Sequence, residues 1–177
     1  MKKQYLIITY IILIFIFSVF YLSLDKKTIY NTEDLIGKKI NEVELNLFDK
    51  GTFNTKEISN YNYTLINFWA SWCGPCRKEH KYLVKLSKVK NLKIIGVNFK
   101  DEDSKARKFL LEMGNPFFIL AKDKQGKKTV DFGVYGIPET ILVNKNLIIL
   151  KIYIGPLNIK DVNEINKIIN QGNKYFY

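Results

Sequence analysis

The sequence predicts an α/β domain that follows a single membrane-spanning helix, and three observations lead to this prediction. The stretch from Tyr5 to Leu24 has no charged residue and is rich in isoleucine, leucine and phenylalanine. Beyond it, short apolar runs typical of strands alternate with segments of helical spacing. One apolar run, residues 65–70, leads through a Cys-x-x-Cys pair directly into a helical segment, which is the strand-then-helix order of an α/β domain.

The N-terminal apolar stretch is long enough to cross a membrane. At about 1.5 Å per residue, its 20 residues span the roughly 30 Å hydrocarbon core. A cleavable signal peptide would have a shorter apolar region and a small-residue cleavage site, whereas no alanine occurs before Ala70. We therefore expect residues 1–27 to form an uncleaved anchor with a short linker, and residues 28–177 to form one domain. Two lysines precede the span and two follow it, so charge alone leaves its orientation open.

The elements of the domain follow from its apolar periodicity. Val43, Leu45 and Leu47 alternate with polar residues and predict a half-buried strand, which a turn and residues 52–54 extend to a hairpin. Residues 65–70 are nearly all apolar, as in a central strand covered on both faces. The strand–helix–strand–helix order predicts right-handed crossovers between parallel strands. The remaining predicted elements are helices at 75–89, 104–113 and 161–169, and strands at 92–97, 140–143 and 147–154.

The charge composition argues against a nucleic-acid partner. Of 177 residues, 28 are basic and 17 acidic, which gives a net charge of +11, yet only Arg77 and Arg107 are arginines. Proteins that read nucleic acids rely on arginine for bidentate contacts. The lysines are also scattered along the chain rather than clustered in one segment. A solvated, lysine-rich surface explains the excess, and we expect no nucleic-acid partner.

The two cysteines of the chain, Cys73 and Cys76, indicate redox chemistry. A structural zinc site needs four ligands, whereas the chain has two cysteines and one histidine. Covalent haem attachment needs a histidine directly after the second cysteine, where Arg77 stands. A purely structural disulfide would close a very small loop and constrain little of the unfolded chain. We therefore expect a redox-active Cys73–Cys76 disulfide and no metal or other cofactor.

The place of this pair at the start of a helix predicts a role for each thiol. Cys73 falls at the helix N-terminus, where free backbone N–H groups and the helix dipole favour a thiolate. We assign Cys73 as the attacking thiol, because the thiolate is the nucleophile. Cys76 lies one turn further and is assigned as the resolving thiol. Pro75 fits the first helical turn, where its missing N–H costs nothing.

Three sequence blocks resemble a known family. The segment 68–76, FWASWCGPC, resembles the active-site segment of the thioredoxin superfamily. Residues 133–140, GVYGIPET, and residues 96–101, GVNFKD, followed by GNPF at 114–117, are similar to the membrane-anchored thiol:disulfide interchange proteins of cytochrome c maturation, the CcmG/DsbE type. The likeness covers about residues 35–157. It implies a thioredoxin-like fold with an added N-terminal β-hairpin.

The resemblance also implies a substrate-binding surface. Pro138 matches the cis-proline that faces the cysteine pair in this superfamily, although an ordinary trans proline that opens the next strand is the alternative. The backbone at Ile137 would then pair with an extended substrate segment. Gly74 and Pro75 are the pair found between the cysteines of reducing thioredoxins. Trp72, directly before Cys73, is the expected substrate contact.

Proton transfer is where the sequence departs from thioredoxin. Asn67 stands where thioredoxins have a buried aspartate that helps to move the proton of the resolving thiol, and asparagine cannot titrate. We expect another acid to serve, and the candidates are Glu79 and Glu139, which match acidic residues near the site in the maturation family. For Glu79, the alternative is a solvated helix carboxylate that pairs with a nearby lysine.

The family implies a reductant that keeps the haem-binding cysteines of apocytochromes c reduced, directly or through an intermediary thiol protein. An integral-membrane electron carrier would re-reduce it, with the anchor in the inner (cytoplasmic) membrane and the domain facing the periplasm. One alternative is an anchored thioredoxin-like reductase of broader substrate range. A second alternative is a non-catalytic module that binds or chaperones thiol proteins. A dithiol oxidase is disfavoured by Gly74 and Pro75.

Overall fold

A computed structural model describes residues 2–24 and 32–173 of the chain. The chain divides into two compact units, Met1–Asn31 and Thr32–Tyr177. The domain boundary predicted between residues 27 and 28 lies outside the described residues.

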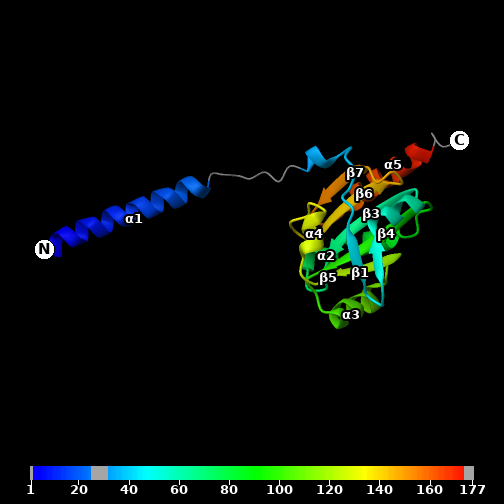
Figure 1. The fold of residues 1–177 in the computed structure, drawn as a ribbon, viewed down its shortest axis with the longest axis horizontal. Helices are drawn as coiled ribbons and strands as arrows, with labels where there is room; N and C mark the ends of the chain where they lie inside the picture. Colours follow the sequence, from blue (N-terminus) through cyan, green and yellow to red (C-terminus); the bar gives the residue numbers. More distant parts are fainter. Residues whose placement is uncertain (1, 25–31, 174–177) are drawn as a thin grey trace. The chain divides into compact units, whose positions relative to one another are not determined.

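The described part of the first unit is one helix, α1 (Lys2–Leu24), which confirms the predicted apolar helix and extends it toward the N-terminus (Figure 1). Residues 2–23 are long and apolar enough to cross a membrane. The large apolar side chains of α1, among them those of Ile14 and Phe17, are exposed. A helix that is apolar on all sides needs an apolar surrounding, which a bilayer provides.

The second unit is built on a seven-stranded mixed sheet with the order β2-β1-β5-β4-β3-β6-β7 (Figure 1). The strands β3, β4 and β5 run parallel, and the other pairings are antiparallel. All side chains of β3 are buried, as its apolar run predicts. The strands are β1 (Glu44–Leu47), β2 (Thr52–Asn54), β3 (Tyr63–Trp69), β4 (Leu92–Phe99), β5 (Ile119–Asp123), β6 (Glu139–Asn144) and β7 (Ile149–Ile154).

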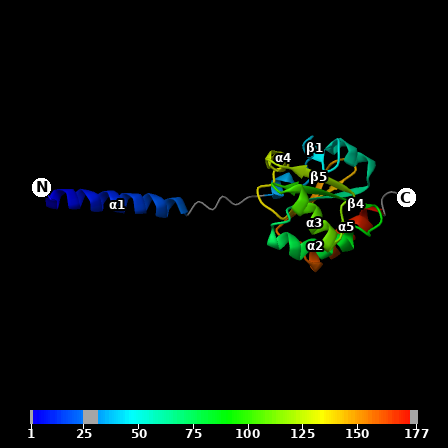
Figure 2. The ribbon, with the colours of Figure 1, turned by 90° about the horizontal axis from the view of Figure 1, so that it is seen from below.

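Helices cover both faces of this sheet. Figure 2 shows α2, α3 and α5 on one side and α4 on the other. The first side holds one apolar cluster, to which α2 contributes Leu83 and α5 contributes Val162 and Ile165. The second cluster lies on the opposite face and includes Ile58 and Phe132. The helices are α2 (Gly74–Leu86), α3 (Asp103–Met113), α4 (Lys127–Asp131) and α5 (Ile159–Asn173), with short 3₁₀ helices at Glu33–Leu35 and Thr55–Asn60.

The predicted order of strands and α-helices is confirmed, with two additions, β5 and α4. The β1–β2 hairpin precedes β3 and turns at Gly51, which has a φ of 90°. Strand β5 was not predicted, because its sequence ends in Lys122 and Asp123 and has no clear two-residue period. It forms a strand because it pairs with β4 on one side and β1 on the other. The short helix α4 was also not predicted.

Gly96 makes room for an aromatic stack close to the end of β3. It lies in β4 opposite Asn67 of β3. A Cβ atom built at Gly96 would lie 2.6 Å from the ring of Phe117. That ring stacks on Trp69, the last residue of β3, with 5.3 Å between the ring centroids. The absence of a side chain at position 96 therefore lets Phe117 cover the strand that leads to the cysteines.

Replacing Gly96 with alanine should lower the free energy of unfolding by about 1–3 kcal/mol, because the new methyl group overlaps a buried ring that has little room to move. Urea denaturation of the full-length protein in detergent measures this loss. Gly136→Ala is the matched control, since no atom lies within 4 Å of the place that its new methyl group would take, and should change stability by less than about 0.5 kcal/mol. Equal stability of the two variants would contradict the packing argument.

Candidate active site

The two cysteines lie at the junction of β3 and α2, joined by a disulfide with an S–S distance of 2.04 Å. Cys73 is the N-cap of α2, and its sulfur accepts a hydrogen bond from the Cys76 backbone N–H at 3.2 Å. Pro75 occupies the first helical turn as predicted. Cys73 is 5% exposed and Cys76 is 2% exposed. Opening the disulfide would leave the Cys73 sulfur at a helix N-terminus, which favours a thiolate.

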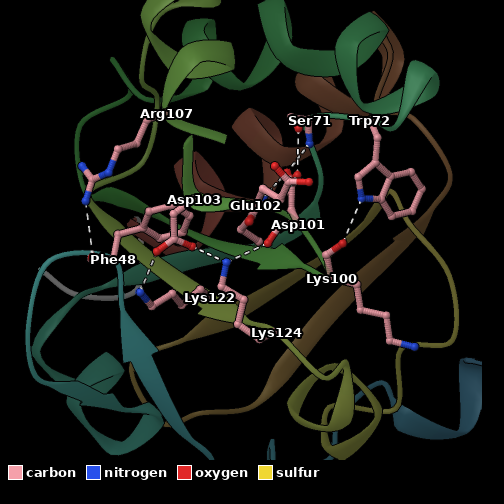
Figure 3. Close-up of polar contacts among 11 residues, drawn as sticks. Phe48, Ser71, Trp72, Lys100, Asp101, Glu102, Asp103, Arg107, Lys122 and Lys124 are labelled. Carbon is pink, nitrogen blue, oxygen red and sulfur yellow. Dashed lines mark hydrogen bonds and ion pairs between the residues drawn. The ribbon is translucent and has the colours of Figure 1, made fainter. Parts of the chain in front are cut away.

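The surface beside the cysteines is formed by the residues expected to contact substrate. Trp72 is 59% exposed, whereas Trp69 is buried in the core. Gly74 and Pro75 are exposed on the first turn of α2. The Trp72 indole Nε1 donates a hydrogen bond to the Lys100 carbonyl at 3.1 Å, which fixes the ring across the end of the sheet (Figure 3).

Pro138 lies at the start of β6, next to the end of β3. The Ile137–Pro138 peptide bond is cis, so the trans alternative is wrong. The next residue, Glu139, pairs with Phe68 in the antiparallel register of β3 and β6. Pro138 is therefore opposite the end of β3, where the cysteine segment begins. Ile137 is half-buried at the same edge of the sheet.

Glu79 is a buried carboxyl on the same face of α2 as Cys76. Its side chain is fully buried, so the alternative of a solvated carboxylate is wrong. Its Oε1 accepts a hydrogen bond from Asn67 Nδ2 at 2.9 Å, and its Oε2 accepts one from the Leu157 N–H at 2.8 Å. Burial raises the pKa of Glu79 from 4.5 to about 7, against the lowering effect of these two bonds, and the negative charge of Asp161 adds to the rise.

Asn67 of β3 holds the Glu79 side chain at the position below the cysteines. The Asn67 side chain is buried on β3 and donates to both Glu79 Oε1 and Thr140 Oγ1, each at 2.9 Å. The carboxyl group that β3 does not provide at this position is therefore provided by α2, one helical turn after Cys76. A carboxyl group with a pKa near 7 exchanges protons readily at neutral pH.

The structure separates the two acids that the sequence pairs as candidates. Side chains of a strand alternate between faces, so Glu139 shares its face with Ile141 and Val143 of β6. Those two residues belong to the apolar cluster on the side of α4. Glu79 lies on the opposite face, under α2 with the cysteines. The catalytic roles of Glu79 and Glu139 remain predictions. Of these two acids, only Glu79 lies on the same face of the sheet as Cys76.

Several contacts of the site were missed by sequence reasoning. Asp101 accepts hydrogen bonds from the backbone and hydroxyl of Ser71, directly before Trp72 (Figure 3). Asp101 closes the block at 96–101, but no sequence signal indicates this contact across 30 residues. Thr140 and the Leu157 N–H were missed for the same reason. In the described ranges, no three His, Cys, Asp or Glu side chains gather as a metal-binding group.

The comparisons with known proteins agree with this geometry. The family model described as Redoxin matches residues 35–169. The chain is 40% identical over 127 residues to the thiol:disulfide interchange protein DsbE of Haemophilus influenzae, which covers 71% of this chain and 70% of that protein. It is 37% identical over 165 residues to DsbE of Pasteurella multocida, which covers 90% of each chain.

A solved structure confirms the thioredoxin-like fold. The crystal structure of a protein assigned as a thiol:disulfide interchange protein DsbE from Chlorobium tepidum superposes with a TM-score of 0.66 at 26% identity. The match covers 77% of this chain and 96% of that one. From the matched family model, the identity to its relatives and the disulfide at the β3–α2 junction, it follows that the chain belongs to the Redoxin family, among the thiol:disulfide interchange proteins of the DsbE type.

Proposed function

We propose that this protein is a membrane-anchored thiol:disulfide reductant that keeps the haem-binding cysteines of apocytochromes c reduced during cytochrome maturation. The observation that carries the proposal is the Cys73–Cys76 disulfide at the N-terminus of α2, next to the cis Pro138. The thiol:disulfide interchange activity of the DsbE relatives supports the chemistry. The sequence blocks at 96–101 and 133–140, which resemble the CcmG/DsbE type, support the role in cytochrome maturation.

The reaction is a two-electron exchange. The thiolate of Cys73 attacks one sulfur of the substrate disulfide, which breaks the S–S bond and releases the other sulfur as a thiolate that takes up a proton. The thiol of Cys76 then loses its proton and attacks the Cys73 sulfur of the mixed disulfide. The second substrate sulfur leaves as a thiol, and the protein ends as the Cys73–Cys76 disulfide. The cysteine pair is the only redox group that this proposal requires.

Glu79 is suited to the second step. Cys76 and Glu79 are three residues apart on one helix, so their side chains are neighbours. With a pKa raised to about 7 by burial, the Glu79 carboxylate is basic enough to accept the Cys76 proton and acidic enough to return it. Glu139, on the other face of the sheet, would act through the backbone beside Pro138 rather than on the thiol itself.

The substrate surface consists of Trp72, Gly74, Pro75 and the segment at Ile137 and Pro138. An extended chain that pairs with the Ile137 backbone would carry its cysteines past the exposed Trp72. The helix α1, which is long and apolar enough to span a membrane, supports a single-pass anchor. The likeness to the DsbE type is the basis for proposing the inner membrane for this anchor and the periplasm for the substrate surface. An integral-membrane electron carrier would return the oxidised pair to the dithiol.

Serine substitutions at the two cysteines should have different consequences. Cys73→Ser removes the nucleophile and should abolish the reduction of insulin disulfides by the full-length protein in detergent. Cys76→Ser keeps the nucleophile but cannot resolve the mixed disulfide, so a covalent protein–substrate adduct should accumulate on a non-reducing gel. Insulin reduction that persists without Cys73 would contradict the redox assignment.

The contribution of Glu79 to the stability of the oxidised protein should fall as the pH rises through the folded-state pKa of its carboxyl group. The unfolded carboxyl group ionises near pH 4.5 and the folded one near 7, so between these values the folded state binds the extra proton. The stabilisation is complete below pH 4.5 and its loss, about 3 kcal/mol, is complete above pH 7. Urea denaturation at pH 5 and pH 8 measures the fall, and the disulfide keeps both thiols out of the titration.

Glu79→Gln should lack this fall, because its side chain does not titrate. Glu112→Gln, which removes an exposed carboxylate, is the control and should behave as the wild-type protein does. A parallel loss of stability in Glu79→Gln and the wild-type protein between pH 5 and pH 8 would assign the titration to another group.

The proposed role in the cell has its own test. Cells that carry Cys73→Ser in place of the wild-type protein should lose c-type cytochromes on a haem-stained gel of their membranes. A small dithiol in the medium should restore them, because it reduces the apocytochrome cysteines directly. Unchanged cytochromes would leave the thiol:disulfide chemistry intact and indicate an anchored reductase of broader substrate range.

A further inference from the structure

The turn before Cys73 sets where the redox pair lies relative to the sheet. The Cys73 N–H donates to the Ala70 carbonyl at 3.2 Å, which closes a turn over Ser71 and Trp72. Ala70 is fully buried directly after β3, so one end of the turn is fixed by the core. The other end is the N-cap of α2. Any movement of the turn therefore moves the Cys73 sulfur and the Trp72 ring together.

The turn is bound by one buried carboxylate from another part of the chain. Asp101 is 7% exposed and lies between β4 and α3. Its Oδ2 accepts hydrogen bonds from the Ser71 N–H at 2.6 Å and from Asn98 Nδ2 at 3.0 Å. Its Oδ1 accepts from the Ser71 hydroxyl at 2.8 Å and from the Glu102 N–H at 2.8 Å. Hydrogen bonds to an ionised acceptor are stronger than neutral ones, and a buried donor left without its acceptor is costly.

The loop that carries Asp101 is itself fixed to β5 (Figure 3). Lys124 donates to the Asp101 carbonyl at 2.8 Å and also pairs with Asp103. Lys122 pairs with Asp103 at 2.9 Å. At the other end of the loop, the Lys100 N–H donates to the Asp123 carbonyl at 3.0 Å. Because β5 is part of the sheet, Asp101 connects the turn before Cys73 to a rigid element.

We propose that Asp101 is a positioning residue for disulfide exchange, and that it acts mainly on the reduced protein. The inference rests on the proposed function. In the oxidised state the S–S bond ties Cys73 to the body of α2. Reduction breaks that bond, and the contacts of the turn then hold the Cys73 sulfur next to the Cys76 N–H. Asp101 therefore stabilises the dithiol state more than the disulfide state.

The test is the equilibrium of the full-length protein in detergent with glutathione. The protein dithiol and one glutathione disulfide form the protein disulfide and two glutathione thiols, so the electron pair passes from the protein to glutathione. Asp101→Asn should raise the constant for protein oxidation about tenfold, because an amide accepts through one oxygen only, so one bond from Ser71 is lost and the other loses its charge assistance. Ser71→Ala keeps the carboxylate charge of Asp101 but loses the hydrogen bond from the Ser71 hydroxyl. It should raise the constant for protein oxidation about threefold.

Glu102→Gln is the matched control, because it removes an exposed carboxylate next to Asp101 whose side chain contacts Lys105 rather than Ser71 or β5. Its constant should stay within about twofold of the wild-type value, as expected for an exposed ion pair. Urea denaturation of each variant in both redox states completes the cycle, and the reduced state of Asp101→Asn should lose more stability than its oxidised state.

Three outcomes would overturn the proposal. Equal destabilisation of both redox states by Asp101→Asn, with an unchanged constant, would make Asp101 a structural residue only. A fall of the constant would mean that the carboxylate acts through its charge on the Cys73 thiolate. If Asp101→Asn does not fold, Ser71→Ala decides alone, and a constant equal to the wild-type value overturns the proposal. A wild-type protein that does not exchange with glutathione would instead contradict the proposed function.

Discussion

The burial of β3 on both faces is the constraint on which the site depends. Its side chains are all buried, and it pairs with β4 on one side and with β6 on the other. The direction of β3 delivers the cysteine segment to the edge of the sheet where β4 also ends and β6 begins. That edge is where ligands bind in sheets with parallel strands, because the loops that follow the strands meet there. Trp72, Asp101 and Pro138 come together for this reason although the chain separates them widely.

The alternation of side chains along β3 and β6 decides which acid meets the cysteines. Asn67 and Thr140 point to the face under α2, where Asn67 donates hydrogen bonds to both Thr140 and Glu79. Glu139 is one residue before Thr140 and therefore points to the other face. A shift of one residue in the β3–β6 register would exchange these positions. The register is thus as much a part of the proposed proton transfer as the identity of the acids.

The elements with strong apolar periodicity could be predicted from the sequence, and those defined by pairing could not. The alternation of Val43, Leu45 and Leu47 predicted the hairpin, and the apolar run at 65–70 predicted β3, because burial imposes these patterns directly. Strand β5 ends in Lys122 and Asp123, and its state follows from its two neighbours in the sheet. The cysteine pair was predictable because both thiols are close in sequence. The contact of Asp101 with Ser71 was not, because a hydrogen bond between distant residues leaves no periodic signal.

Two buried carboxyl groups of the site, those of Asp101 and Glu79, differ in how many donors surround them, and this difference separates their roles. Among the described residues, the Asp101 carboxylate accepts four hydrogen bonds, about as many as its lone pairs can take. The Glu79 carboxyl group accepts two from the described residues, which leaves acceptor positions free. A carboxylate with every acceptor position filled is suited to hold the backbone in one geometry. A carboxyl group with free acceptor positions and a pKa near 7 is suited to exchange a proton with the thiol beside it. The site therefore has one acid that fixes where Cys73 lies and another that is able to respond when Cys76 changes its charge.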